Sequence, residues 1–294
     1  MKLLILAHNP SGYATRRLAE AAVQRGHTVE MARPLDCVVR LNGRFTTITH
    51  AHHDLTQFDV ALLRTVGQSY MGHEISVPLE SYLATQLALA GVRCLNTPAA
   101  KQIASDKFHT LQLLNHAGLP IPDSWLVGGL ERMRETAVND LPLPAVIKLP
   151  RGSWGAGVIK VETAEAALST HHLLSSLSKI ATVQAFVAAA NNQDIRAFVV
   201  GDKVVAAMRR TAPAGDFRAN IHLGGTAVAV TLPPATQAIA VAAAQTVGLE
   251  VAGVDLLETA SGPLVIEVNS TPGLEEIEAT TGVDVAGAVI GYLG

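Results

Sequence analysis

Two carboxylates and a carboxamide near the C-terminus are spaced so that one surface could hold all three. Apolar runs flank a Ser261-Gly262 turn signal, and we expect them to pair as antiparallel strands. If the turn centres on Ser261, Asp255 lies opposite Glu267, and Asn269 points to the same face two residues later. Unpaired carboxylates in an apolar sheet repel each other and lose hydration, so the pattern predicts a hard cation such as Mg²⁺. The alternative is a hairpin with one face in water, where carboxylates are ordinary.

A glycine-rich segment supplies a second candidate site. Residues 152–157, Gly-Ser-Trp-Gly-Ala-Gly, lie between two strand patterns, whereas a Rossmann or Walker loop would open a helix. Glycines at a hairpin tip let backbone N–H groups close over phosphates. Lys148 lies in the apolar strand just before this loop, where a cation is unusual unless it binds an anion. A merely flexible hairpin is the alternative for the loop taken alone.

Arginines are prominent on a predicted hairpin, residues 194–210, that turns at Gly201-Asp202. Arg196 and Arg209 are about equally far from that turn, so we expect them to neighbour each other on one face. Two adjacent guanidinium groups need an anion between them, and a transferring phosphoryl group is a suitable one. The alternative is two solvated arginines on an edge strand. The polar, glycine-bracketed segment 215–225 follows and is expected to close over a substrate.

Other side chains are weaker candidates. The pairs His52-His53 and His171-His172 are interpreted as solvated surface rather than a metal site, because adjacent residues on a helix do not face each other. Trp154 either stacks on a ligand in the closed site or anchors the glycine loop. Arg64 ends a predicted strand in the first unit, on the side where α/β sheets bind ligands, and is a candidate substrate contact.

Composition limits the class of protein. The chain has 294 residues, of which 49% are hydrophobic, enough for two or three packed units. A net charge of −3 argues against a nucleic-acid partner, and no apolar run reaches the roughly 18 residues of a membrane span. The first apolar run stops at His8, too early for a signal peptide, so it is expected to form a buried strand. Cys37 and Cys94 lack metal-ligand spacing, fit a reducing cytoplasm, and are not predicted nucleophiles.

Hydrophobic periodicity predicts the elements that position these residues. The first hundred residues alternate strand and helix patterns, which indicates an α/β layer with a mainly parallel sheet. No Gly-x-Gly-x-x-Gly follows the first strand, so a dinucleotide site there is not expected. Residues 96–98 break the alternation and give the first boundary. The helix after this boundary is expected to begin at Ser105 and end at Gly118.

Taken in order, these motifs resemble the ATP-grasp superfamily and, within it, the RimK-like ligases, with LysX-type ligases as close relatives. The segment from Glu267 to Gly273, Glu-Val-Asn-x-x-Pro-Gly, is the most specific of them, together with residues 280–284. The resemblance covers essentially the whole chain. The other matching segments are Asp106-Lys107, Lys148, the glycine hairpin, and residues 183–187, 194–196 and 216–220.

The resemblance implies an α/β protein with the ATP-grasp fold in three parts. Residues 1–97 are expected to form an N-terminal α/β pre-ATP-grasp domain. Residues 98–184 and 185–294 are expected to form the central and C-terminal α+β subdomains that bind ATP between them.

The resemblance also assigns roles to residues. It implies that Asp255, Glu267 and Asn269 bind Mg²⁺ or Mn²⁺, as two ions. Catalytic contacts are implied for Arg209, Arg218 and Asn220. In place of the Glu that usually follows the hinge Gln, this chain has Ala185, which puts affinity for ATP in question. The residues implied to bind ATP are Lys107, Lys148, Gly152, Ser153, Gly155, Gly157, Gln184, Ala185, Phe186, Val187, Asp194, Arg218 and Asn220.

Three functions are compatible with these motifs. The first is a RimK-like ligase that adds an amino acid, glutamate first, to a protein or peptide carboxylate through an acyl phosphate. The second is a LysX-like or dipeptide-forming ligase that uses another amino acid, as residues 152–155 suggest. The third is a nucleotide-binding regulator without turnover, which Ala185 favours and the intact metal trio disfavours. Residues 216–220 favour the first, since the Arg218 fork can pair with a carboxylate. A cytoplasmic homo-oligomer, dimer or tetramer, without nucleic-acid or membrane partners, is expected.

Overall fold

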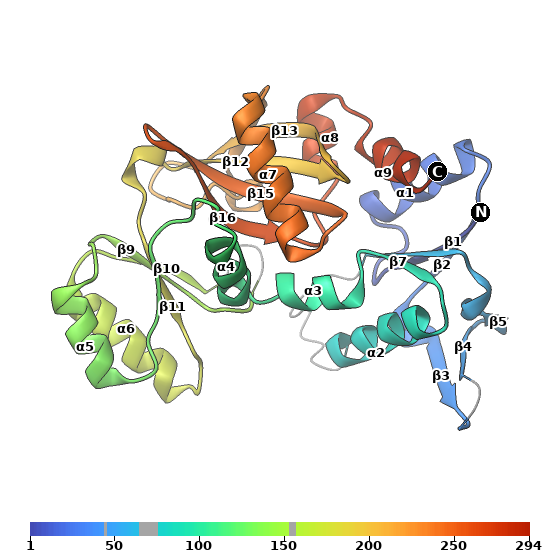
Figure 1. Cartoon of the computed structure of the whole chain (residues 1–294), viewed down its shortest axis with the longest axis horizontal. Coiled ribbons are helices and arrows are strands. Elements are labelled where there is room, and N and C mark those ends of the chain that lie inside the picture. The colour runs from blue at the N-terminus through green and yellow to red at the C-terminus, as the bar shows by residue number, and fades with distance from the viewer. Residues whose placement is uncertain (44–45, 65–75, 153–156) are drawn as a thin grey trace.

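The computed structural model describes residues 1–43, 46–64, 76–152 and 157–294. Three main sheets follow one another along the chain, and Figure 1 shows the sheet of the central unit projecting at one end of the molecule. Within the described residues, no helix is long and apolar enough to cross a membrane. The division at residues 97 and 98 and at 184 and 185 stays a prediction.

The first sheet is parallel, as the alternation of strand and helix patterns predicts. Its strand order is β2-β1-β6-β7, and all its pairings are parallel. A small antiparallel sheet, β3-β4-β5, follows β2 and was not predicted from the sequence. The elements of this unit are β1 (Lys2–Leu6), α1 (Tyr13–Gln24), β2 (Thr28–Ala32), η1 (Pro34–Asp36), β3 (Cys37–Leu41), β4 (Thr46–His50), β5 (His53–Asp54), η2 (Leu55–Gln57), β6 (Val60–Leu63), α2 (Ser76–Leu89) and β7 (Arg93–Leu95).

Two short helices connect the first sheet to the central one. Helix α3 (Pro98–Ala104) begins at Thr97, whose hydroxyl accepts the Ala100 N–H at 3.3 Å. Helix α4 (Lys107–His116) begins at Asp106, whose carboxylate accepts the N–H groups of the next turn. The predicted start at Ser105 is therefore wrong: Ser105 ends α3, and the acidic Asp106 is the N-cap.

The central sheet is antiparallel, with strand order β10-β9-β11-β8. Helices α5 and α6 cover it, and Met133, Ile147, Ala167 and Val183 lie in the apolar core between helices and sheet. Its elements are β8 (Ser124–Leu126), α5 (Leu130–Asn139), β9 (Ala145–Lys148), β10 (Val158–Val161), α6 (Ala164–Ser176) and β11 (Thr182–Ala185).

The third sheet is also antiparallel, with strand order β14-β13-β12-β15-β16. Helix α7 packs on one face, and α8 and α9 pack toward the other (Figure 1). The elements are η3 (Ala188–Ala190), β12 (Gln193–Val200), β13 (Lys203–Thr211), η4 (Ile221–Leu223), β14 (Thr226–Ala229), α7 (Pro234–Val247), β15 (Val251–Thr259), β16 (Gly262–Asn269), α8 (Glu275–Thr281) and α9 (Val285–Leu293).

One bulge in the β12–β13 hairpin decides which arginine faces the site. The extra residue, Val205, shifts the register, so that Asp194 pairs with Arg210 instead of Arg209. Because successive side chains alternate between faces, Arg210 shares a face with Asp194 and Arg196, and Arg209 lies on the other face. The prediction that Arg196 and Arg209 neighbour each other is therefore wrong.

A second bulge, in the β15–β16 hairpin, gives the strand pairing that the sequence predicts. The two-residue turn is Ala260-Ser261, so a regular ladder would pair Asp255 with Ile266. The extra residue restores the pairing of Asp255 with Glu267, and that predicted pairing is confirmed.

The first and third sheets share one apolar core. Leu3, Ile5 and Leu62 of the parallel sheet belong to the same buried cluster as Phe198 and Ile290 of the third unit. At the edge of this cluster, α1 contacts α9. The central unit has a separate core, so the first and third units form one support against which the central unit is placed.

Candidate active site

A compact network of charges covers one face of β12, β13 and β15. The Arg210 guanidinium donates to both oxygens of Asp194, at 2.6 and 2.8 Å, and lies 3.1 Å from Asp255 Oδ2. Arg196 donates hydrogen bonds to both carboxylate oxygens of Asp255, from Nε and from Nη2. Asp255 and Arg210 are each 3% exposed, so these ion pairs are shielded from water.

Burial and the neighbouring charges shift the pKa values of the two aspartates in opposite directions. Burial raises the pKa of Asp255, but the charges and hydrogen bonds of Arg196 and Arg210 outweigh burial and lower it overall. For Asp194, burial dominates over Arg210, and the negative charge of Asp255 adds to it, so the pKa is raised. The lowered pKa favours the ionised form of Asp255, which is the state a metal ligand requires.

Glu267 faces this network from the neighbouring strand and is paired with a lysine from α4. Lys107 Nζ lies 2.6 Å from Glu267 Oε1 and donates to the Gly152 carbonyl at 2.8 Å. The lysine side chain is 16% exposed. Lys107 therefore joins the third sheet to the start of the glycine loop, where a phosphate chain would need its charges neutralised.

The second predicted lysine approaches from the central sheet. Lys148 Nζ donates to Gln184 Oε1 at 2.6 Å, and Gln184 is in turn bonded to the Ser124 hydroxyl. Burial lowers the pKa of Lys148 to about 8; Glu267 and Asp255 oppose this, while Lys107 adds to it. Lys148 is thus close enough to Glu267 and Asp255 for their charges to affect its pKa, although it comes from a different sheet.

The predicted metal trio shares a face, and its donor set fits Mg²⁺ or Mn²⁺. Asn269 pairs with Gly253, two residues from Asp255, and its Nδ2 lies 3.4 Å from Asp255 Oδ2. Two carboxylates and one amide are ligands that Mg²⁺ accepts when substrate phosphates complete the shell. In the described part of the chain, no group of three or more His, Cys, Asp or Glu side chains could hold a metal ion. The assignment of a metal to the carboxylate-amide trio stays a prediction.

In the predicted adenine hinge, some backbone N–H groups are hydrogen-bonded within the protein and one is not. The Ala185 N–H donates to the Asp123 carbonyl at 2.9 Å, and the Phe186 N–H donates to the Pro144 carbonyl at 3.1 Å. The Val187 N–H donates to no backbone carbonyl in the described residues. Because proline lacks a backbone N–H, Pro144 cannot donate a hydrogen bond to the Phe186 carbonyl. The hinge therefore keeps a donor available for an adenine edge.

Segment 216–225 lies folded against the hinge. The Phe217 and Phe186 rings meet edge to face with centroids 6.0 Å apart. Arg218 and Asp216 are paired within the segment at 2.8 Å, and hydrogen bonds from Arg218 help lower the Asp216 pKa to about 2. Asn220 is the N-cap residue of η4, and its predicted contacts with phosphate and substrate stay a prediction. The fork of Arg218 is thus already engaged by a carboxylate of its own loop.

Two predicted residues, Ser153 and Gly155, lie outside the described residues, as does Trp154. Gly157 is described and adopts a φ of +72°, where a Cβ would approach Leu149 Cδ1 to 2.9 Å. The hairpin therefore requires glycine at residue 157 for both conformation and space.

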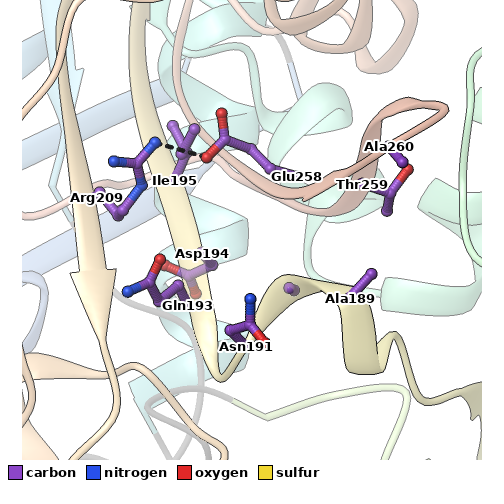
Figure 2. A pocket seen from close by; sticks show the side chains of 10 residues that line it. Ala189, Asn191, Gln193, Asp194, Ile195, Arg209, Glu258, Thr259 and Ala260 are labelled. Atoms are coloured by element: carbon purple, nitrogen blue, oxygen red, sulfur yellow. Dashed lines mark hydrogen bonds and ion pairs between the residues drawn. The ribbon is translucent and has the colours of Figure 1, made fainter.

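Arg209 does not lie beside Arg196, contrary to the prediction from the sequence, whereas the predicted role of Asp194 in ATP binding stays a prediction. Arg209 Nη2 donates to Glu258 at 2.6 Å on the face opposite the metal trio, and the pair borders a cavity of about 290 Å³ (Figure 2). Asp194 also borders this cavity, but its carboxylate is occupied by Arg210. Sequence reasoning missed Arg210 because nothing in the sequence indicated the bulge.

The histidine pairs do not behave alike. His171 is 3% exposed and bonded to the Val127 carbonyl, so the predicted solvated position is wrong for it. His53 is exposed and paired with Glu30, as a surface residue would be. Neither cysteine is disulfide-bonded, and burial raises the pKa of Cys37 and of Cys94 to about 11, which disfavours a thiolate nucleophile.

Comparisons with known proteins agree with the fold. The model of the RimK-like ATP-grasp domain matches residues 104–293, and that of the RimK PreATP-grasp domain matches residues 1–100. A protein from Shewanella amazonensis named "Probable alpha-L-glutamate ligase 1" is 41% identical over 293 residues, covering 100% of this chain and 95% of the relative. The predicted ATP-grasp fold class is confirmed.

Solved structures give the same result. The crystal structure of a RimK domain ATP-grasp protein from Sphaerobacter thermophilus aligns with a TM-score of 0.75, 26% identity and full coverage of both chains. The ATP-grasp ligase PsnB in complex with a minimal precursor aligns with a TM-score of 0.78 and 22% identity, covering 99% of this chain and 97% of PsnB. PsnB has also been solved with precursor peptide PsnA2 and AMPPNP.

Proposed function

This chain belongs to the RimK-like ATP-grasp family, and we propose that it joins an amino acid, glutamate first, to a carboxylate of a protein or peptide. Membership makes it an ATP-dependent ligase that forms C–N bonds. The observation that carries the proposal is the facing arrangement of Asp255 and Glu267 with Lys107 and Lys148, which come from different units.

The proposed mechanism uses these side chains for charge neutralisation and positioning. Lys107 and Lys148 hold the ATP phosphates, and Arg210 replaces Arg209 as the arginine near the developing charge. Asp255, Glu267 and Asn269 would hold Mg²⁺ or Mn²⁺, proposed as two ions, whose charge offsets that of the phosphates.

The reaction follows from the chemistry of carboxylates. An oxygen of the acceptor carboxylate attacks the γ-phosphorus, ADP leaves, and an acyl phosphate forms. The amine of the incoming amino acid then attacks the acyl carbon, phosphate leaves, and the nitrogen releases a proton. No protein nucleophile is required, which agrees with the raised pKa of both thiols.

The choice of glutamate rests on relatives and not on Arg218. The relative from Shewanella amazonensis is named a glutamate ligase. Arg218, which suggested an acidic substrate from the sequence, is paired with Asp216 and so gives no separate support. A peptide or protein acceptor is supported by PsnB, whose fold is similar and which was solved with a precursor peptide.

A screen for amino-acid-dependent ADP release tests this function. Purified protein is incubated with Mg²⁺, ATP, candidate peptide acceptors and each of the twenty amino acids, and products are identified by mass spectrometry. We expect glutamate to give the fastest ADP release and a product heavier by one glutamyl residue. Faster turnover with lysine or a neutral amino acid would exclude the glutamate preference and favour a LysX-like ligase, while leaving the ligase class intact.

Location and assembly remain part of the proposal. The unpaired Cys37 and Cys94 support a cytoplasmic location, since a reducing compartment keeps thiols free. We retain a homo-oligomer, dimer or tetramer, and light scattering of the purified protein would decide it.

A further inference from the structure

Two basic side chains meet at the carboxyl edge of the first sheet, away from the phosphate-binding lysines. Arg64 follows β6, and its Nη2 donates to the Pro272 carbonyl at 2.9 Å. Lys101, on α3, donates to the Leu63 carbonyl at 3.1 Å and to the Thr271 hydroxyl at 2.8 Å. This edge of a parallel sheet is where α/β folds bind ligands.

Burial shifts the pKa of both basic groups of the cluster. Burial lowers the pKa of Arg64 to about 10. Burial, together with the charge of Arg64, lowers the pKa of Lys101 to about 7, and Glu80 acts in the opposite direction. Glu80 is 6% exposed and is paired with His8 at the end of β1. Arg64, Lys101 and Glu80 are thus charged groups of this cluster in the described part of the chain.

One donor of Arg64 has no acceptor. Its Nε is buried from solvent and makes no hydrogen bond. A buried guanidinium donor without a partner is costly, and a carboxylate is the planar acceptor that suits Arg geometry.

The cluster adjoins the charged face without belonging to it. Pro272, which accepts from Arg64, lies against Gly253: a Cβ there would approach Pro272 Cβ to 2.9 Å and Arg196 Cδ to 3.1 Å. Arg196 is the residue that grips Asp255. A ligand held by Arg64 therefore lies beside the reacting centre, while its own anchoring groups are distinct from Lys107 and Lys148.

We propose that Arg64 and Lys101 form a subsite for the non-reacting carboxylate of the amino-acid substrate, an inference that rests on the proposed ligase function. The acceptor carboxylate must approach the γ-phosphate, and the phosphates have their own lysines. The carboxylate that stays unchanged in the reaction is the one that needs a separate cationic holder, and it leaves the amine free to attack.

Direct binding tests the subsite without an acceptor. Isothermal titration measures the affinity of L-glutamate for the protein saturated with Mg²⁺ and AMPPNP. Lys101→Met and Arg64→Gln should each weaken glutamate binding about 10- to 100-fold, since each removes a charge-assisted hydrogen bond, and AMPPNP affinity should stay unchanged. Lys101→Arg should retain most of the affinity. Lys203→Met, at the exposed β12–β13 turn, is the matched control and should bind like wild type.

Proton linkage separates a binding role from a structural one. A bound carboxylate raises the pKa of Lys101, so glutamate binding near pH 7 should take up protons, seen as a dependence of the binding heat on buffer ionisation. Lys101→Met should abolish that uptake. Wild-type affinity for glutamate in both Lys101→Met and Arg64→Gln would overturn the subsite while leaving the ligase proposal intact. Absence of amino-acid-dependent ADP release, measured separately, would overturn the ligase proposal itself.

Discussion

The two acidic residues of the predicted metal trio are already paired with basic side chains in the free protein. Asp255 is gripped by Arg196 and approached by Arg210, and Glu267 is paired with Lys107. Both carboxylates are thus paired with basic side chains before any ligand arrives. A divalent cation with phosphates can replace this neutralisation with little reorganisation, because the charges are already in place.

Replacing Glu267 with Gln should lower the rate of ADP release about 100-fold at saturating ATP and Mg²⁺, since one proposed metal ligand loses its charge. The assay is ADP release with glutamate and an acceptor peptide. Glu258→Gln is the matched control, because Glu258 lies on the same hairpin and pairs with Arg209 on the opposite face. Wild-type rates in Glu267→Gln would exclude the metal assignment.

Nucleotide affinity should fall as pH rises above about 8. Burial lowers the Lys148 pKa to about 8 in the free protein, and only the protonated lysine attracts phosphates. Binding therefore raises this pKa, and the Kd of AMPPNP should increase with pH beyond it, up to tenfold per unit. Lys148→Arg should show a flatter profile between pH 7 and 9.5. An equally steep rise in both proteins would assign the dependence to another group.

At the scale of elements, each of the two hairpins, β12–β13 and β15–β16, contains one β-bulge that determines which side chains face the site. Each carries one bulge that exchanges the faces of the residues beyond it. In β15–β16 the bulge brings Asp255 and Glu267 together. In β12–β13 it turns Arg210 toward them and Arg209 away.

The adjacent arginines provide a test of this register. Arg210→Met removes the partner of two buried carboxylates and should destabilise the protein by about 3–5 kcal/mol, with loss of ADP release. Arg209→Met removes a partly exposed pair and should cost about 0–1 kcal/mol. Chemical denaturation measures both. A larger effect of Arg209→Met on stability and rate would contradict the observed register.

The contact between Phe217 and Phe186 should control how segment 216–225 closes. Phe217→Ala removes an aromatic pair worth about 0.5–1.5 kcal/mol, so the KM for ATP should rise about 2- to 10-fold. Hydrogen exchange in segment 216–225 should become faster without nucleotide and slow again with Mg²⁺ and AMPPNP. Exchange identical to wild type in both conditions would mean that this pair does not hold the segment.

At the scale of the whole molecule, the first and third units are joined and the central unit is separate. They share one core, and Arg17 of α1 also pairs with Glu278 and Asp284 at 3.2 and 2.9 Å. The central core comprises residues between Val127 and Val183 alone. The central unit thus has no buried apolar cluster in common with the other two units in the described residues.

The central unit should open before the rest of the molecule does. Native-state hydrogen exchange in rising denaturant should show the slowest amides of residues 124–185 exchanging at a lower free energy than those of β12 and β15. Arg17→Met should lower the opening free energy of the first and third units and leave the central unit unchanged. A single common free energy for all three units would contradict separate cores.

Local sequence determined the chemistry and most of the elements. The parallel first sheet and the buried first strand, β1, follow from local hydrophobic periodicity and were predicted. The pairing of Asp255 with Glu267 on β15–β16 was predicted from the turn signal and the alternation of side chains. The actual turn differs from the predicted one by one residue, and the bulge shifts the register back by one residue. These features depend on neighbours within one hairpin or helix, which a sequence displays directly.

Tertiary structure decided what depends on contacts between distant segments. The small sheet β3-β4-β5 and the bulge at Val205 have no local signal in the sequence. The sequence therefore predicts Arg209 beside Arg196, whereas the bulge places Arg210 on that face. The pairing of Lys107 with Glu267 joins α4 to β16, and the cluster of Arg64 with Lys101 joins two other elements. Their geometry is fixed by packing between units, because a side-chain network of this kind forms only after the backbone of each unit is placed.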